Sequence, residues 1–406
     1  MIKDYYKLIK VYPRFLAFSA LHMFFSSPGQ SFSFALFGPA FSAAFDLGAG
    51  GFGLLYSIAT LISAGLLPIF GPIVDRVNLR ICSILVGTLM AISMLITSFA
   101  TSVPVLFVGV LFLRFSGQGL MTQIGGVSAT RFFGAGRGKA LAIVGLGLSL
   151  GIATFPLALE NLISTFGWEW TLIFLALLVL FLFLPCSMAL LKKSDTFQLP
   201  PARVSEVEYG EKNAWNRKDV LKTPFFYFAV PIALLIPFFS TGLIIHIGSI
   251  ALYKGWTMKW MASCFIISAI SGRVGSFFMG PFVDRFTAKK LFPFVLIPYA
   301  IAMTVAAFNT HPFAAPVWFF LAGASFGCMT VAMSSLWAEA FGIESLGAIS
   351  SLVGATGVFA SALSPFLFGW LLDHGLNIDH LFLSGAFLTI GVSFLGLIAP
   401  APKKHT

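Results

Sequence analysis

The stretch Gly71-Pro72-Ile73-Val74-Asp75-Arg76 is repeated 209 residues later as Gly280-Pro281-Phe282-Val283-Asp284-Arg285, with five of its six positions identical. Each copy stands where a long apolar run ends and charged residues begin. A repeat separated by about half of the 406 residues indicates that one large unit was duplicated in the same orientation. We therefore expect the chain to contain two similar halves.

The composition indicates that most of this chain is surrounded by lipid. Apolar residues make up 58% of the sequence, charged residues only 10%, and the mean hydropathy is +0.93, which leaves too few polar side chains to cover a soluble globule.

Runs of about 20 apolar residues can each cross the bilayer as a helix. Twelve are found, near 15–44, 52–70, 81–101, 104–128, 140–163, 170–190, 225–252, 260–279, 290–308, 314–340, 347–371 and 381–399. The sequence therefore predicts an all-α integral membrane protein with twelve transmembrane helices in two bundles of six. Long continuous apolar runs exclude a membrane β-barrel, whose strands alternate in polarity.

A single polar stretch, from Lys192 to Lys222, separates the two sets of helices. Its content of charged residues and proline is typical of a linker. The predicted organisation is an N-terminal bundle over 1–190, a cytoplasmic linker over 191–223 and a C-terminal bundle over 224–406. The first apolar run is longer than the core of a signal peptide and is interpreted as the first spanning helix.

The distribution of Lys and Arg predicts the orientation in the membrane. Of the 25 basic residues, 21 fall in segments on one side, Lys254 and Lys259 fall on the other, and Arg114 and Arg273 lie inside predicted helices. By the positive-inside rule, both termini and the linker are cytoplasmic in a multi-pass protein of the inner (cytoplasmic) membrane. The same asymmetry accounts for the net charge of +10, so no nucleic-acid partner is needed to explain it.

Motifs for enzymatic chemistry are not found. The sequence has no zinc-protease motif, no nucleophile elbow and no phosphate-binding loop. Its four cysteines lack the spacing of metal ligands and are interpreted as core residues. We therefore expect neither an enzyme nor a bound cofactor or metal, and no obligatory protein partner is inferred. Membrane lipid is the expected surrounding.

The repeated turn has a mechanical interpretation. A glycine lets a neighbouring helix approach, an aspartate can face a helix N-terminus, and an arginine can pair with that aspartate. Here the chain resembles the major facilitator superfamily, whose loop between the second and third helices carries a Gly-x-x-x-Asp-Arg core, matched by Gly71, Asp75 and Arg76. The resemblance implies a cytoplasmic gate that also includes Arg131 and the second copy, Gly280, Asp284 and Arg285. The alternative is that these charges only fix the topology.

Two further stretches resemble bacterial relatives of the monocarboxylate and oxalate/formate transporters. They are Arg114-Phe115-Ser116-Gly117-Gln118-Gly119, followed by Arg131-Phe132-Phe133, and Leu336-Trp337-Ala338-Glu339-Ala340-Phe341-Gly342. The resemblance implies a secondary transporter that moves a small organic anion by alternating access, driven by protons or by a counter-substrate. The first-helix signature of the animal carriers and the eleventh-helix lysine of the oxalate exchanger are missing, so neither lactate nor oxalate specificity is carried over.

Charges inside a membrane are costly and are candidates for function. Arg273 ranks first, because it lies deep in the eighth predicted helix and its planar guanidinium can bind a carboxylate with two hydrogen bonds. In the resembling transporters, an arginine of the eighth helix binds the substrate carboxylate, and animal carriers place an aspartate one turn earlier, where this chain has Ala269. The alternative is an interhelix pair or a contact with unwound carbonyls.

Further candidate substrate-binding residues are Arg114 with Gln118 on the fourth helix, His22 with Gln30 on the first, and His246 on the seventh. The first two pairs lie at helical spacings, as expected for polar stripes. Arg114 is either a second anion contact or a packing residue. His22 can change charge near neutral pH, yet a neutral histidine bonded to a neighbouring helix explains it equally well.

Glu339, near the cytoplasmic end of the tenth helix, joins His22 as a candidate for proton coupling, with a helix-end carboxylate as the alternative. Three functions fit these residues: a carrier of a small organic anion, an exporter of drugs, siderophores or other amphipathic compounds, and a non-transporting receptor. A buried cation favours the first.

The predicted orientation can be tested with topology reporters. Reporters fused after Lys193 and at Thr406 should both report a cytoplasmic position, and one inserted beside Lys254 should report the opposite side. A reporter after Lys193 that is found outside the cell would overturn the assignment.

Overall fold

The computed structural model describes residues 2–133, 137–191, 215, 217–342 and 346–400. Every regular element in these ranges is a helix. Within them, nine helices are long and apolar enough to cross a membrane, and one of the nine runs over 53 residues, from Gly138 to Leu190. The predicted class, an all-α membrane protein, is confirmed.

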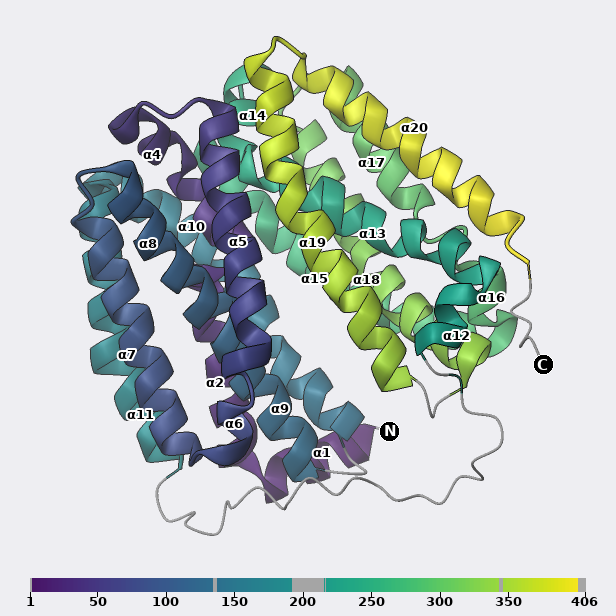
Figure 1. Ribbon diagram of the computed structural model, residues 1–406, viewed down its shortest axis with the longest axis horizontal. Coiled ribbons are helices and arrows are strands. Elements are labelled where there is room, and N and C mark those ends of the chain that lie inside the picture. Colours follow the sequence, from purple (N-terminus) through teal and green to yellow (C-terminus); the bar gives the residue numbers. More distant parts are fainter. Residues whose placement is uncertain (1, 134–136, 192–214, 216, 343–345, 401–406) are drawn as a thin grey trace. The chain divides into compact units, whose positions relative to one another are not determined.

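The described chain forms two compact units. The first contains Met1–Leu47 and Leu55–Ser205, and the second contains Gly48–Leu54 and Glu206–Thr406. Figure 1 shows the helices of both units, coloured along the sequence from purple at the N-terminus to yellow at the C-terminus.

The first unit is built from helices with several interruptions. Its elements are α1 (Ile2–Val11), α2 (Pro13–Phe25), η1 (Ser27–Gly29), α3 (Ser31–Phe34), η2 (Ala35–Phe37), α4 (Gly38–Phe45), α5 (Ala49–Phe70, whose first turn belongs to the second unit), α6 (Ile73–Arg76), α7 (Leu79–Ser98), α8 (Val103–Arg114), η3 (Phe115–Met121), α9 (Thr122–Phe133), α10 (Arg137–Leu178), η5 (Val179–Phe183) and α11 (Leu184–Leu190).

The first predicted span is broken rather than continuous. Where one helix is expected over 15–44, α2 ends at Phe25 and Gln30 adopts an extended conformation, with φ −83° and ψ 157°. Pro28 and Gly29 lie within the break, and proline has no N–H to donate to a helix. The break thus leaves main-chain carbonyl oxygens without a helical partner, and because lipid chains offer no donors, these oxygens need other partners within the protein.

The fifth and sixth predicted spans follow one another along α10. The chain turns between them at Gly167, whose φ of 82° and ψ of 167° lie outside the helical region. Glycine tolerates a positive φ because it has no Cβ. The predicted gap between 163 and 170 therefore corresponds to this residue.

The second unit contains α12 (Arg217–Lys222), α13 (Pro224–Ile245), α14 (Ile247–Lys254), α15 (Met258–Phe286), α16 (Ala288–Leu291), α17 (Ile297–Phe308), α18 (Ala314–Phe341), α19 (Leu346–Asp373) and α20 (Ile378–Leu397). Within this unit, α15 packs on α18, α13 on α19 and α17 on α20 (Figure 1). The ninth predicted span, 290–308, is interrupted: its first two residues end α16, residues 292–296 form turns that include Pro293, and the helix α17 begins at Ile297.

The first turn of α5 belongs to the second unit because the end of α19 holds it. Both carboxylate oxygens of Asp373 accept hydrogen bonds, from the N–H of Ala49 at 3.0 Å and of Gly50 at 2.8 Å. A carboxylate at a helix N-terminus satisfies free donors and opposes the helix dipole. Gly369 allows this approach, since a Cβ there would lie 2.2 Å from the Ala49 carbonyl oxygen.

The pairing of α15 with α18 depends on small residues. A Cβ at Gly327 would lie 2.0 Å from the Gly272 oxygen, and one at Gly275 would lie 2.5 Å from the Ala324 oxygen. The Ser276 hydroxyl lies 3.0 Å from the carbonyl oxygens of both Gly272 and Gly327. Small residues at the contact of two membrane helices let their backbones approach, and this close approach allows tight packing and interhelical hydrogen bonds.

Gly327→Ala should therefore destabilise the protein, because the new methyl group requires α15 and α18 to separate. Overpacking of this kind costs about 1–3 kcal/mol. Gly391→Ala is the matched control, since a Cβ at Gly391 in α20 meets nothing within 4 Å. Thermal unfolding in detergent should show a lower Tm for Gly327→Ala only, and equal Tm values would contradict the packing argument.

Candidate functional site

The first unit contains a buried cation beside the break in its first span. Arg114, the last residue of α8, is 1% exposed. Its Nη1 donates to the Gly29 carbonyl oxygen at 2.8 Å, and its Nε donates to Thr60 Oγ1 at 3.2 Å. The guanidinium carbon lies 4.4 Å from the centroid of the Tyr56 ring. Arg114 thus joins η1 and α5 to the fourth span, and its cation–π contact offsets part of the cost of burial.

The backbone around Arg114 is irregular on both sides of the contact. On the fourth span, Phe115–Met121 forms the π-helix η3 directly after Arg114. A Cβ at Gly29 would lie 2.8 Å from the Cα of Gly117, and one at Gly117 would lie 2.7 Å from the Cα of Gly29. Short π-helical segments within α-helices are frequent at functional sites. Two glycines therefore let a broken helix and a π-helix meet beside the arginine.

The Arg114 guanidinium keeps hydrogen-bonding capacity after these contacts. Arginine has five N–H donors, and Arg114 uses two of them on Gly29 and Thr60. Among the described residues, no carboxylate forms an ion pair with Arg114. A buried charge without a counter-ion is costly, so this site has the chemistry to hold an anion.

His22 lies in the same unit, at the contact of the first and third spans. Its Nδ1 is 2.8 Å from the Phe18 carbonyl oxygen and its Nε2 is 2.8 Å from Ser83 Oγ. A neutral imidazole with its hydrogen on Nδ1 satisfies both contacts, because Nε2 then accepts from the serine hydroxyl. The geometry is that of a histidine bonded to a neighbouring helix, and its role in proton coupling stays a prediction.

The two predicted glutamines lie on the segments that carry Arg114 and Gly29. Gln30 is half-buried at the end of η1, where its Nε2 donates to Ser26 Oγ at 3.3 Å. Gln118 is half-buried within η3, one turn beyond Arg114. The structure thus gathers Arg114, Gln30 and Gln118 on adjoining segments of one unit. The sequence analysis did not single out Tyr56 and Thr60. Their spacing of four residues places them on one face of an otherwise apolar helix, and this pattern could have indicated a polar contact.

The candidates of the second unit lie in separate surroundings. His246 is buried at the C-terminus of α13, with Nε2 2.7 Å from the Pro365 carbonyl oxygen on α19. Arg273 is exposed on α15, on a face shared with Ile270 and Phe277. The Glu339 carboxylate accepts from the N–H groups of Ala288 at 2.8 Å and Lys289 at 3.1 Å. Glu339 therefore caps the start of α16, while its predicted proton role stays untested.

The two copies of the repeated turn have different surroundings. A Cβ at Gly71 would lie 2.6 Å from the Gln123 side chain, whereas a Cβ at Gly280 would meet nothing within 4 Å. Asp284 and Arg285 are exposed, and Arg285 lies 5.2 Å from the Phe286 ring centroid. The side chains of the other predicted gate residues, Asp75, Arg76 and Arg131, lie outside the described residues. The gate therefore stays a prediction.

Two bundles of spanning helices, in which some helices are broken or kinked and polar groups are buried, are typical of polytopic helical transporters. The sequence matches the Major Facilitator Superfamily over residues 20–274 and 257–406, and the chain belongs to this family. Its fold is similar to a crystal structure of a mutant of the nucleoside transporter NupG, with a TM-score of 0.74, 14% identity, and coverage of 94% of this chain and 99% of that chain.

A second similar structure is the bacterial homolog of the human lysosomal transporter Spinster, in an inward-facing and unoccupied conformation. Its TM-score is 0.68, at 16% identity, covering 95% of this chain and 94% of that one. A search of curated proteins finds no match. At these identities the solved structures establish the fold, and the family match establishes a transporter; neither tests the predicted relation to monocarboxylate and oxalate/formate transporters.

The buried bridge at His22 can be tested on α7. Ser83→Ala should leave a buried imidazole nitrogen without a partner, at a cost of about 1–3 kcal/mol. Ser93→Ala is the matched control, because Ser93 is equally buried on α7 but bonds only to Met90 of its own helix. Thermal unfolding should show a lower Tm for Ser83→Ala than for Ser93→Ala, and the reverse order would refute the bridge.

Proposed function

We propose that this member of the Major Facilitator Superfamily is a secondary transporter of a small organic anion, a monocarboxylate or a related metabolite, driven by proton coupling or by exchange. The observation that carries the proposal is Arg114, a buried cation with N–H donors to spare and no carboxylate partner among the described residues. An arginine in such surroundings can bind a carboxylate through two parallel hydrogen bonds.

The surroundings of Arg114 support recognition rather than packing alone. Its bonds to Gly29 and Thr60 hold the guanidinium in one orientation, so little conformational entropy is lost when a ligand binds. Charged hydrogen bonds in a partly dry site contribute about 1.5–3 kcal/mol each. Gln30 and Gln118 on the adjoining segments are amide groups that can bond to further oxygens of a ligand.

Arg273, the first-ranked candidate of the sequence, is the other anion contact in this proposal. It lies on an exposed face of α15 within a membrane span, where a charged side chain requires water, a partner or a ligand. Arg114 belongs to the first unit and Arg273 to the second, and each is proposed as an anion contact by itself. For proton coupling, His22, His246 and Glu339 are the candidate titrating groups, and exchange against a second anion needs none of them.

The anionic substrate can be tested by a thermal-shift screen of metabolites against the purified protein. A ligand that binds only the folded state raises the Tm. We expect carboxylates to raise it and neutral nucleosides or cationic drugs to have no effect. Stabilisation by nucleosides or amphipathic cations alone would overturn the proposal.

The two arginines can then be tested with the anion that gives the largest shift. Arg114→Lys and Arg273→Ala should each weaken equilibrium binding by roughly tenfold to a hundredfold. Lysine keeps the charge of Arg114 but loses the planar fork. Lys259→Ala, at the N-terminus of α15, is the matched control and should bind the anion as the wild type does. Unchanged affinity in both folded arginine variants would rule out their role.

A further inference from the structure

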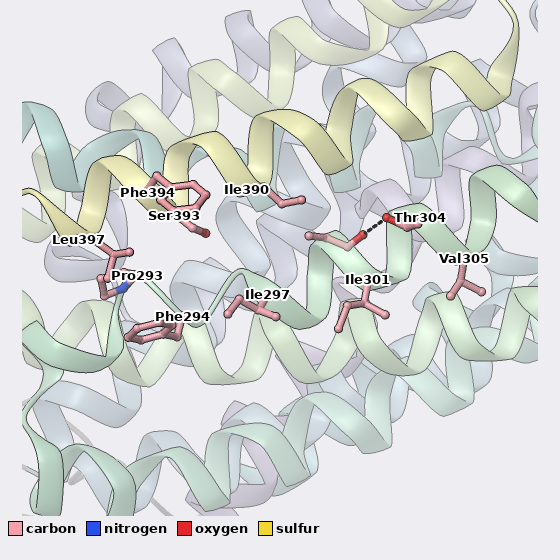
Figure 2. A pocket seen from close by; sticks show the side chains of 11 residues that line it. Pro293, Phe294, Ile297, Ile301, Thr304, Val305, Ile390, Ser393, Phe394 and Leu397 are labelled. Carbon is pink, nitrogen blue, oxygen red and sulfur yellow. Dashed lines mark hydrogen bonds between the residues drawn. The ribbon is translucent and has the colours of Figure 1, made fainter.

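A groove of about 500 Å³ lies between α17 and α20 of the second unit (Figure 2). It is lined by Pro293, Phe294, Ile297, Ile301, Ile390 and Phe394, among others, and its walls are almost wholly apolar. Several of these side chains, including Ile301, Ile390 and Phe394, are exposed, so the groove is open at the surface of two membrane helices. Its volume falls within the range of about 300–1,000 Å³ that is usual for small-molecule sites.

The length of the groove fits one leaflet of a bilayer. On α17 its walls run from Ile297 to Val305, a rise of about 12 Å at 1.5 Å per residue, and Pro293 and Phe294 extend it further along the chain. Half of a hydrocarbon core of about 30 Å is about 15 Å. An acyl chain lying parallel to the two helices would therefore span the groove.

Basic side chains stand near one end of the groove. Lys289 and Lys290 of α16 are exposed and precede Pro293 by three or four residues, a span of at most about 14 Å. Lys222 lies near the same end, because Phe225, three residues after it, is in ring contact with Phe292 at 6.1 Å. In the predicted orientation this end is cytoplasmic, where anionic lipid headgroups attract Lys and Arg.

The acidic groups at this end do not cancel the lysines completely. Both carboxylate oxygens of Glu339 are engaged by the N–H groups of Ala288 and Lys289. Asp219 of α12 is half-buried. Asp284 is exposed in the last turns of α15, where Arg285 also lies. The exposed cations therefore outnumber the exposed carboxylate, and an anionic headgroup complements them.

One polar atom inside the groove has no partner. The Ser393 hydroxyl is buried and makes no hydrogen bond to any described residue, and Figure 2 shows it on the side of α20 that faces α17. The other hydroxyl of the lining, that of Thr304, donates to the Ala300 carbonyl oxygen at 2.9 Å. Ser393 is one turn from Leu397, toward the end that carries the lysines, and an ester carbonyl just below a headgroup can accept from it.

We propose that this groove binds one anionic phospholipid, with an acyl chain between α17 and α20 and the phosphate at Lys289 and Lys290. The apolar walls recognise the chain, the lysines recognise the charge, and Ser393 donates to the ester. The lipid acts as a fixed ligand of the second unit rather than as exchanging solvent.

The test is lipid binding to the full-length protein in neutral detergent, measured by native mass spectrometry. The probes are phosphatidylglycerol and phosphatidylcholine with the same acyl chains, and inorganic phosphate alone. We expect phosphatidylglycerol to bind at least tenfold more tightly than phosphatidylcholine, and phosphate alone not to bind. Equal affinity for the two lipids, or binding of phosphate alone, would overturn the proposal.

Two variants locate the site. The double variant Lys289→Gln with Lys290→Gln should lose roughly fivefold to thirtyfold in affinity for phosphatidylglycerol and none for phosphatidylcholine. Ile390→Trp should fill the groove and abolish binding of both lipids. The matched controls are Lys259→Gln at the other end of α15 and Ile81→Trp, an equally exposed isoleucine on α7. Unchanged selectivity in the lysine variant, which alters only surface side chains and should fold, would refute the site.

Discussion

The hydrogen bond from Arg114 to the Gly29 carbonyl oxygen is the contact on which the first unit depends. Backbone groups in a bilayer need partners within the protein, because lipid chains offer none. Breaking the first span at Pro28 and Gly29 removes helical partners, and the guanidinium supplies one in their place. The same bond fixes the orientation of the arginine. Structure and candidate function thus share one interaction, since the group that repairs the broken helix is also the group that can receive an anion.

Close backbone contact occurs in both units, beside a break in a helix in the first and at a helix crossing in the second. In the first unit, Gly29 and Gly117 let η1 reach the π-helix η3, and in the second, Gly272 and Gly327 bring α15 against α18. In lipid, burial of apolar area gives little drive for helices to associate. Close packing and polar contacts, such as the Ser276 hydroxyl near the Gly272 and Gly327 oxygens, therefore carry much of the specificity.

The two copies of the duplicated turn show that a common origin does not preserve a common environment. Gly71 is crowded by Gln123, whereas Gly280 has open space around it. The second unit also carries features with no equivalent described in the first: Glu339 caps α16, and an apolar groove is lined by α17 and α20 near two lysines. The two halves of this transporter therefore share one fold but differ in their local contacts, and in our proposals the second unit carries a lipid groove in addition to its candidate substrate residues.

Sequence alone determined the membrane class, the duplication and most of the spans, because hydropathy and helix length are local properties that the bilayer thickness constrains directly. It also singled out Arg114 and Arg273, since intramembrane charge is rare. Tertiary structure decided what these residues contact. The break at Gln30, the partners Gly29, Thr60 and Tyr56 of Arg114, and the bond from His22 to Ser83 join residues tens of positions apart. Such partners depend on which helices pack together and at what height, and no local pattern encodes that choice.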